Sequence, residues 1–296
     1  MGYSVTLLRN GFFRLDAGSM FGLIPKTVWE RWVEVDEQNR MTLQQNSLLL
    51  ESSDGELVLI EAGIGDKFGD KERAMYGLGE DWRGVHESVR EADRDPADIG
   101  AVVLTHLHFD HAGGLTTFGE GGSIDLAFPN ARIIVQEREW QDAIANKSTM
   151  TKTYLKEHLT PEVADRLDVI GEDEPDEVEV MPGLRVIRTP GHTWGQQSVV
   201  FDCVGCGAEG MPEGIAGRRL CFVSDVMPTR WHSRPTTNLA YDVEAYTSMV
   251  ARQKLMQRAS DEGWAVMPNH DPSPSPFFTI EPDAENPRRW RVDPVA

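Results

Sequence analysis

The sequence is poor in cysteine, in basic residues and in long apolar runs, and each shortage excludes a class of protein. Three cysteines in 296 residues are too few for the disulfide framework that small secreted domains use. The first residues carry no basic stretch followed by an apolar one, so we recognise no signal peptide. No apolar run approaches the roughly 20 residues that span a bilayer. The cytoplasm is therefore the expected compartment.

The shortage of basic residues is the strongest of these biases. With 29 Lys and Arg against 48 Asp and Glu, the net charge is −19, which disfavours nucleic acid and anionic membranes as partners. The hydrophobic share of 40% is close to the usual globular level and suffices for a sizeable core. We therefore expect neither nucleic acid nor a membrane as a partner.

Predicted strands and helices alternate along the chain in two similar sets. The hydrophobic patterns predict strands at residues 42–50, 56–61, 101–104, 132–135, 184–188, 197–201, 219–224 and 265–267. They predict helices at residues 81–92, 136–145, 152–167 (with a break at Pro161) and 242–262. Each set resembles a sheet with helices on its outer face, so we expect a four-layer α/β sandwich. We expect one domain over residues 1–296, with residues 1–40 and 272–296 as extensions and the proline-rich tail on the surface.

Metal-binding residue types follow the ends of four predicted strands. The stretch VVLTHLHFDHAGGLT places three histidines and an aspartate directly after strand 101–104. One further candidate follows each of three later strands: His192, Asp225 and His270. Loops at strand ends are where α/β proteins assemble sites, and imidazole and carboxylate are good ligands for a borderline metal. The strand ends therefore predict a metal centre.

The spacing allows these residues to be divided between two ions. His106 and His108 are two positions apart, so in extended backbone both side chains point to one side. The tight turn that follows, helped by Gly113-Gly114, presents the next two candidates to a second position close by. The predicted ligands are His106, His108 and His192 for one ion, and Asp110, His111 and His270 for the other. Asp225 has two carboxylate oxygens and could bridge the ions, which in such pairs typically lie about 3.5–4 Å apart.

Histidine is more often a surface or core residue than a ligand, so each one is weighed separately. His86 and His158 lie on predicted helices among charged neighbours, and we expect both at the surface. Five of the eight histidines fall at strand ends, three of them within one hexapeptide. That clustering favours the metal centre, and Asp225 and His270 gain their weight only from the shared pattern.

Cys203 and Cys206 form a C-x-x-C pair. A structural zinc site would need two more ligands, and Cys221 is the one cysteine left. The pair does not open a predicted helix, as a redox pair should. We expect a tight hairpin here, with a disulfide or a metal as the alternative.

The motifs together resemble those of the metallo-β-lactamase superfamily. THLHFDHAGG is similar to its His-x-His-x-Asp-His signature, and TPGHT, SD and NHD follow in the family's order. The resemblance covers about residues 40 to 270. It implies an αββα fold and a two-metal centre held by the seven residues above, with zinc as the usual ion and iron or manganese in some relatives. One position departs: Glu61, in LIEAG, stands where the family has an aspartate that supports a metal-binding histidine.

The predicted centre implies hydrolysis. Two metal ions that share a water would lower its pKa, for a single zinc ion from 15.7 to about 7, and so hold hydroxide at neutral pH. One ion would also polarise a carbonyl or phosphoryl oxygen of the substrate. Asp110 is the candidate catalytic residue, which would orient the nucleophile and later pass a proton to the leaving group. The expected reaction is hydrolysis of an ester-like bond.

Segments outside the metal motifs are similar to those of quorum-quenching N-acyl-homoserine lactonases, in particular the YtnP-like branch. They are MFGLIPKTVW, FPNARIIVQEREW, SDVMPTRWH and NLAYD. Methyl parathion hydrolase is similar in layout, so a phosphotriester or a thioester is the alternative substrate. A non-haem iron oxidoreductase is less favoured, because oxygen-reducing relatives carry glutamate where this chain has His108. A binding protein with an inactive site is also disfavoured, because all seven positions hold competent ligands.

Two segments supply the candidates for substrate contact. Met20 and Phe21 belong to an apolar N-terminal segment that is equally typical of core or of a dimer contact, so a homodimer is possible. Met227, Trp231 and His232 follow a predicted ligand closely, and a loop that leaves a ligand must start near the site. For His232 we slightly prefer the alternative of a solvent-facing side chain.

Overall fold

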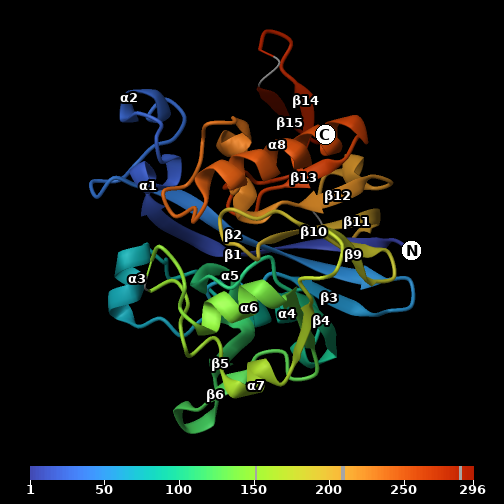
Figure 1. Cartoon of the computed structure of the whole chain (residues 1–296). Helices are drawn as coiled ribbons and strands as arrows, with labels where there is room; N and C mark the ends of the chain where they lie inside the picture. The colour runs from blue at the N-terminus through green and yellow to red at the C-terminus, as the bar shows by residue number, and fades with distance from the viewer. Residues whose placement is uncertain (151, 208–210, 287–288) are drawn as a thin grey trace.

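The structure is a computed structural model that describes residues 1–150, 152–207, 211–286 and 289–296, and helices cover both faces of its strand layers (Figure 1). The strands are β1 Tyr3–Asp16, β2 Arg40–Ser52, β3 Leu57–Ile60, β4 Ile99–Val103, β5 Thr116–Phe118, β6 Ile124–Leu126, β7 Arg132–Gln136, β8 Leu167–Ile170, β9 Glu177–Met181, β10 Leu184–Arg188, β11 Gln197–Cys206, β12 Arg219–Phe222, β13 Ala265–Met267, β14 Phe278–Pro282 and β15 Trp290–Pro294. The helices are α1 Ala17–Phe21, α2 Lys26–Trp29, α3 Asp70–Tyr76, α4 Val85–Glu91, α5 Phe109–Ala112, α6 Glu137–Ile144, α7 Pro161–Ala164 and α8 Ala245–Asp261.

The two predicted halves are joined into one mixed sheet. Among the described residues it holds 13 strands, in the order β15-β14-β13-β12-β11-β1-β2-β3-β4-β7-β8, with β10 and β9 branching from β11. Strand β11 makes the junction. Its first residues pair with β10 and β12, and its last residues, from Cys203 to Cys206, pair with β1.

The inner core lies between the two halves of the sheet. Leu50 and Val103 of one half belong to the same buried cluster as Phe201 and Phe222 of the other. Central strands that are covered on both sides bury both faces, which is why Leu48, Leu49 and Leu50 in β2 are all inaccessible. Burying each such side chain stabilises the fold by about 1.5–3 kcal/mol.

The outer faces of the sheet are covered by helices. On one side Val85 and Val89 of α4 pack on the first half, and on the other side Leu255 and Met256 of α8 pack on the second. Figure 1 shows α8 in the upper half of the view and α4, α6 and α7 in the lower half. The predicted four-layer αββα arrangement is confirmed.

The predictions at the edges of the sheet were less accurate. Most of residues 152–167 is not helical, since only Pro161–Ala164 forms a helix and residues 167–170 form the edge strand β8. The tail expected on the surface instead forms β14 and β15, which extend the sheet by antiparallel pairing. The 14-residue strand β1 was not predicted. A search of the described helices finds none with the length and apolarity to cross a membrane.

Candidate metal centre

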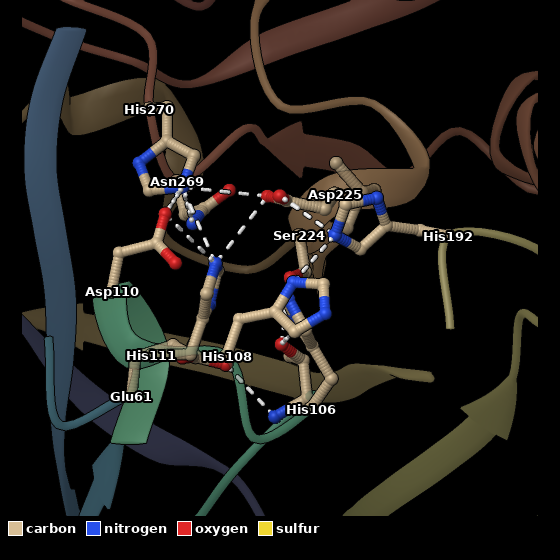
Figure 2. Close-up of polar contacts among 12 residues, drawn as sticks. Glu61, His106, His108, Asp110, His111, His192, Ser224, Asp225, Asn269 and His270 are labelled. Atoms are coloured by element: carbon tan, nitrogen blue, oxygen red, sulfur yellow. Dashed lines mark hydrogen bonds and ion pairs between the residues drawn. The ribbon is translucent and has the colours of Figure 1, made fainter. Parts of the chain in front are cut away.

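The seven predicted ligands lie together and buried where the strands end. Figure 2 shows their side chains pointing toward a common centre, with the carboxylate of Asp225 between the two groups of imidazoles. They are His106, His108, Asp110, His111, His192, Asp225 and His270, and each is at most 7% exposed. The loops after β4, β10, β12 and β13 carry them. Loops far apart in sequence therefore meet at one place, as the strand-end pattern predicted.

The glycines of the first motif allow its turn to pack closely against the loop after β3. A Cβ on Gly113 would lie 2.0 Å from the carbonyl oxygen of Ile64, and one on Gly114 would lie 2.1 Å from that of Ala62. The N–H of Ala62 donates to the carbonyl of His111. Only glycine fits there, and the contact fixes α5, which carries two of the ligands.

The first group of ligands contains His106, His108 and His192. Nε2 of His192 lies 3.0 Å from Nδ1 of His108, and Nε2 of His106 is buried with no hydrogen-bond partner among the described residues. Three imidazole nitrogens thus face one point. A buried nitrogen without a partner costs free energy unless something binds it, and a cation at that point would do so.

The second group contains Asp110, His111 and His270. Nε2 of His270 lies 3.3 Å from Nε2 of His111 and 3.5 Å from Oδ2 of Asp110. Asp225 faces both groups: its Oδ2 lies 3.3 Å from Nε2 of His192, and its Oδ1 lies 3.6 Å from Nε2 of His111. One carboxylate therefore offers an oxygen to each group.

These separations suit direct coordination of metal ions. Four ligands arranged tetrahedrally at 2.0–2.1 Å from a zinc ion lie about 3.3 Å from one another, and the nitrogen and oxygen atoms above are 3.0–3.6 Å apart. The donors are imidazole and carboxylate, and neither group contains a thiolate. The buried His/Asp clusters are consistent with a binuclear metal site.

Glu61 supports this arrangement from outside the ligand set. Its Oε2 accepts a hydrogen bond from Nδ1 of His111 at 2.8 Å, and its Oε1 accepts from the N–H of Thr105 at 2.8 Å. The backbone of Glu61 has a φ of 71°, a left-handed conformation that is uncommon outside glycine and often marks functional sites. The departure from the family's aspartate thus keeps the supporting role and gives the carboxylate a second contact.

Sequence reasoning missed Asp242, which supports His192. Its Oδ1 lies 3.0 Å from Nδ1 of His192, and the aspartate side chain is 1% exposed. Hydrogen bonds of this kind fix the orientation of a metal-binding histidine. Gly191, with a φ of 130°, lets the same turn pack against Ser248 of α8, where a Cβ would lie 2.1 Å from the backbone nitrogen. The stretch NLAYD was noted for resemblance, but nothing in it indicated this contact.

Glu139 was also missed, and it ties the two histidine loops together. Its Oε1 accepts from the N–H of Leu107 at 2.9 Å and from the hydroxyl of Tyr154 at 3.0 Å, and its Oε2 accepts from Thr193 at 2.6 Å. The carboxyl is fully buried, and burial raises its pKa. The available signal was the position of this glutamate on the buried face of helix α6. A buried glutamate almost always has polar partners, so this position indicated a structural role.

Burial and neighbouring charges set the protonation of the cluster. Burial, followed by the surrounding histidines, holds the pKa of His106 and of His108 well below the ordinary value, so both imidazoles are neutral, as ligands must be. For His111 burial alone would lower the pKa, but Glu61, Asp110 and Asp225 raise it well above its usual range. The pKa of Asp225 is lowered, because three histidines outweigh the effect of burial.

A pocket of about 110 Å³ opens onto the centre. One wall is made of metal-site residues, among them His108, Asp110, Asp225 and His270. The rest of the lining is largely apolar and includes Leu15, Met20, Tyr76, Phe109, Leu239 and Tyr241. A small, mostly apolar pocket with a few convergent polar groups is typical of ligand and substrate sites.

Of the five candidates for substrate contact, Met20 alone lines this pocket. Phe21 is buried between Trp29 and His232. Met227 packs in the core under α8, and Trp231 packs at the edge of the N-terminal cluster. His232 is fully buried rather than solvent-facing, with Nε2 2.8 Å from the carbonyl oxygen of Met20. It therefore lies behind the pocket wall.

The two remaining predicted surface histidines and the three cysteines also differ from or complete the predictions. His86 and His158 were expected at the surface, but they are 7% and 1% exposed. His86 is buried in α4 together with Val85 and Val89, and the turn that carries His158 packs against Thr116. Cys203, Cys206 and Cys221 are free thiols, and only Cys206 is exposed. None of them is part of the histidine groups.

Residues 40–208 match the sequence profile of the metallo-beta-lactamase superfamily. Among curated relatives, an N-acyl homoserine lactonase from a Bacillus species is 31% identical over 164 residues, which are 52% of this chain and 56% of the relative. The lactonase AttM from Azorhizobium caulinodans is 28% identical over 212 residues, covering 67% of this chain and 68% of the relative. The chain thus spans little more than half the length of the first of these relatives.

Solved structures share the fold at lower identity. A probable metal-dependent hydrolase from Staphylococcus aureus superposes with a TM-score of 0.81 at 23% identity, covering 99% of this chain and 97% of its own. AidC, a dizinc quorum-quenching lactonase, superposes with a TM-score of 0.73 at 17% identity, covering 98% of this chain and 93% of its own. These similarities establish the fold over nearly the whole length of the chain.

Proposed function

The chain belongs to the metallo-beta-lactamase superfamily, and from this premise we propose that it is a two-metal hydrolase that opens a lactone ring, such as that of an N-acyl-homoserine lactone. The observation that carries the proposal is the buried pair of ligand groups with Asp225 between them. The lactone is supported by the relatives that match half of the chain or more and by similar segments outside the metal motifs.

The two ligand groups are the residues that would hold the ions. His106, His108 and His192 would bind one ion, Asp110, His111 and His270 the other, and Asp225 both. Zinc is the ion we expect, because imidazole and carboxylate donors in tetrahedral separation suit it, with iron or manganese as alternatives. When bound, the pair of ions supplies an activated water and polarises the ester carbonyl.

The side chains of this protein would position the reactants and move the proton. In lactone hydrolysis water adds to the carbonyl carbon, the ring C–O bond breaks, and a proton must reach the alkoxide oxygen that leaves. Asp110 lines the pocket beside the histidines, so its carboxylate can orient the nucleophile and carry that proton. Glu61 and Asp242 hold the imidazoles of His111 and His192 in place.

The apolar wall would bind the part of the substrate that does not react. Leu15, Met20, Phe109 and Leu239 line the same pocket as the metal-site residues. An acyl chain laid along them would bury apolar area worth about 25 cal/mol per Å². It would also exclude bulk water from the reacting ester, which strengthens electrostatic interactions at the centre.

The proposal is tested by a substrate panel with the metal content measured in parallel. The panel contains an N-acyl-homoserine lactone, an unsubstituted γ-lactone, a p-nitrophenyl phosphotriester and an acyl thioester. We expect two ions per chain by mass spectrometry and the highest kcat/KM on the N-acyl-homoserine lactone. Activity should disappear on removal of the metal with a chelator and return on addition of Zn²⁺.

The other outcomes separate the alternatives. A preference for the phosphotriester or the thioester would keep the two-metal hydrolase and replace the substrate. One iron per chain with oxygen consumption would replace the reaction class by oxidation. Lactone turnover that survives complete metal removal would refute the proposal.

A further inference from the structure

A second pocket lies on the α8 side of the molecule and shares no lining residue with the pocket at the metal centre. It has a volume of about 700 Å³, within the range typical of small-molecule sites. Its walls come from α2 and the turn after it, from the segment after His232, from α8 and from the β14–β15 hairpin. In Figure 1, α8 and the β14–β15 hairpin lie in the upper half of the view, with α2 to the left.

The charge of this pocket contrasts with that of the whole chain. The net charge of the protein is −19, yet the described residues that line the pocket include Arg234 and Arg289 and no Asp or Glu. Trp32, Trp290 and Val28 provide apolar surface, and Gln253 adds an amide. The pocket therefore combines cationic groups with aromatic and aliphatic walls.

The guanidinium of Arg234 has no hydrogen-bond or ion-pair partner in the part of the chain that the structure describes. Of the arginines that are at least partly buried in the described residues, it is the one whose guanidinium makes no hydrogen bond or ion pair with the protein. Arg258 of α8, by contrast, pairs with Glu177 and Glu262. Burial, and then the charge of Arg289, lower the pKa of Arg234. Both arginines line the pocket, and neither forms a salt bridge with the described residues.

The position of Arg234 leaves its donors free. Its guanidinium carbon lies 4.0 Å from the centroid of the Trp32 ring. In an arginine that stacks on an aromatic face, the N–H groups in the guanidinium plane remain available for a carboxylate or a similar anion. Trp32 in turn packs edge-on against the buried Phe21, so the platform beneath the arginine is fixed.

We propose that this pocket binds an organic anion, with its charged group on Arg234 and Arg289 and its apolar body against Trp32, Val28 and Trp290. An anion would neutralise two like charges for which the described residues supply no partner. The apolar walls select against simple inorganic anions, because these have no body to bury there. The site is separate from the metal centre, so its test does not depend on the reaction at that centre.

The test uses a matched pair of fluorescent probes on the metal-loaded protein. The anion 8-anilinonaphthalene-1-sulfonate and the neutral N-phenyl-1-naphthylamine share the same aromatic body and differ by the sulfonate. We expect one saturable site for the anion, binding about tenfold or more tightly than the neutral probe. Rising sodium chloride should weaken binding of the anion, and inorganic phosphate should not displace it.

Substitutions test whether the anion binds in this pocket. Arg234→Gln should weaken binding of the anion by about tenfold and leave the neutral probe unaffected. Gln253→Glu, which adds a negative charge to the pocket without touching an arginine, should also weaken it. The matched control is Arg31→Gln, which removes the same charge from an exposed arginine that does not line the pocket. Circular dichroism and thermal unfolding verify that each variant is folded.

Three results would overturn the proposal. The neutral probe could bind as tightly as the anion, which would indicate a purely apolar surface. Arg31→Gln could weaken binding as much as Arg234→Gln does, which would indicate a general effect of charge. Phosphate could displace the probe completely, which would indicate a site for simple anions rather than organic ones.

Discussion

All eight histidines of the chain are buried, but five of them converge and three lie apart. At the metal centre, nitrogens of His108, His111, His192 and His270 lie 3.0–3.6 Å from one another or from Asp225, and His106 belongs to the first ligand group. In the other group, His232 bonds with Thr229 and a backbone carbonyl, and His158 has no partner for either ring nitrogen among the described residues. Burial alone therefore does not distinguish a ligand.

The second ring nitrogen distinguishes the two groups further. For three of the five converging histidines an acceptor anchors it: Glu61 for His111, Asp242 for His192 and the carbonyl of Gln44 for His270. Nε2 of His108 has no partner among the described residues. Such an acceptor fixes the tautomer, so the other nitrogen is free to bind a cation. His86 has only a distant carboxylate, Asp66 at 3.9 Å. Convergence therefore separates the two groups, and a carboxylate anchors two of the converging histidines, His111 and His192. Four substitutions test these two features.

The largest effect is expected for His108→Ala. Removing a nitrogen from the first group should leave one ion weakly held, and the loss of several kcal/mol of charge stabilisation should lower turnover about a thousandfold. The fold should be retained, because His108 belongs to the pocket wall rather than to a hydrophobic cluster. Steady-state kinetics and metal analysis measure the effect. His158→Gln is the matched buried control and should keep both activity and metal, whereas full turnover in His108→Ala would refute the assigned ligand.

The second effect concerns anchoring and is expected for Asp242→Asn. The amide keeps the shape and an acceptor oxygen but removes the charge that faces Nδ1 of His192. Loss of such a partner typically lowers metal affinity about 10- to 100-fold, which competition with a chelator would measure. Asp202→Asn is the control, since that carboxylate pairs with Arg219 at the surface. Equal affinity in the two variants would show that anchoring does not separate the two groups of histidines.

The third effect is smaller and concerns His232→Phe. The new ring keeps the stacking on Phe21, but the bonds to Thr229 and to the carbonyl of Met20 are lost. We expect about 1–3 kcal/mol less stability in urea unfolding and a few-fold higher KM, because Met20 lines the substrate pocket. The metal content should not change. Loss of metal in this variant would place His232 with the five converging histidines after all.

The metal centre was more predictable from sequence than the packing around it. The motif through His106 and His111 is local, and strand ends that carry single ligands follow from hydrophobic runs. Asp242 and Glu139 act across long sequence separations, through contacts that no local pattern encodes. Strand β1 escaped prediction for the same reason, because its pairing with β2 and β11 is set by tertiary contacts rather than by its own alternation.

The sequence did not predict the burial of His158, because charged neighbours in sequence do not determine the direction in which a side chain points within a turn. Lys156 and Glu157 flank it, yet residues 152–160 do not form the expected helix, and the backbone turn places the imidazole inward. Its exposed fraction of 1% follows from the packing of this turn against the first motif, where Thr116 donates to the carbonyl of Glu157. Neighbouring charges therefore gave no information about the direction of this side chain.

The smallest effect at neutral pH, and the last test of the comparison, is His158→Leu. Burial, and then the charge of Lys67, lower the pKa of His158 to about 3, below the value of about 6.5 in an unfolded chain. Between these values the unfolded state binds more protons, so the histidine lowers stability as the pH falls below 6.5, by at most about 1.4 kcal/mol per pH unit. In urea unfolding, the free energy of unfolding of the leucine variant should match that of the wild type within about 1 kcal/mol at pH 7 and exceed it at pH 5.

The metal-site histidines are unchanged in both proteins, so their own titration cancels in the difference. An identical pH dependence in the two proteins would mean that His158 is protonated as easily as an exposed histidine. His158 could then no longer serve as the example of a buried histidine without a partner among the described residues.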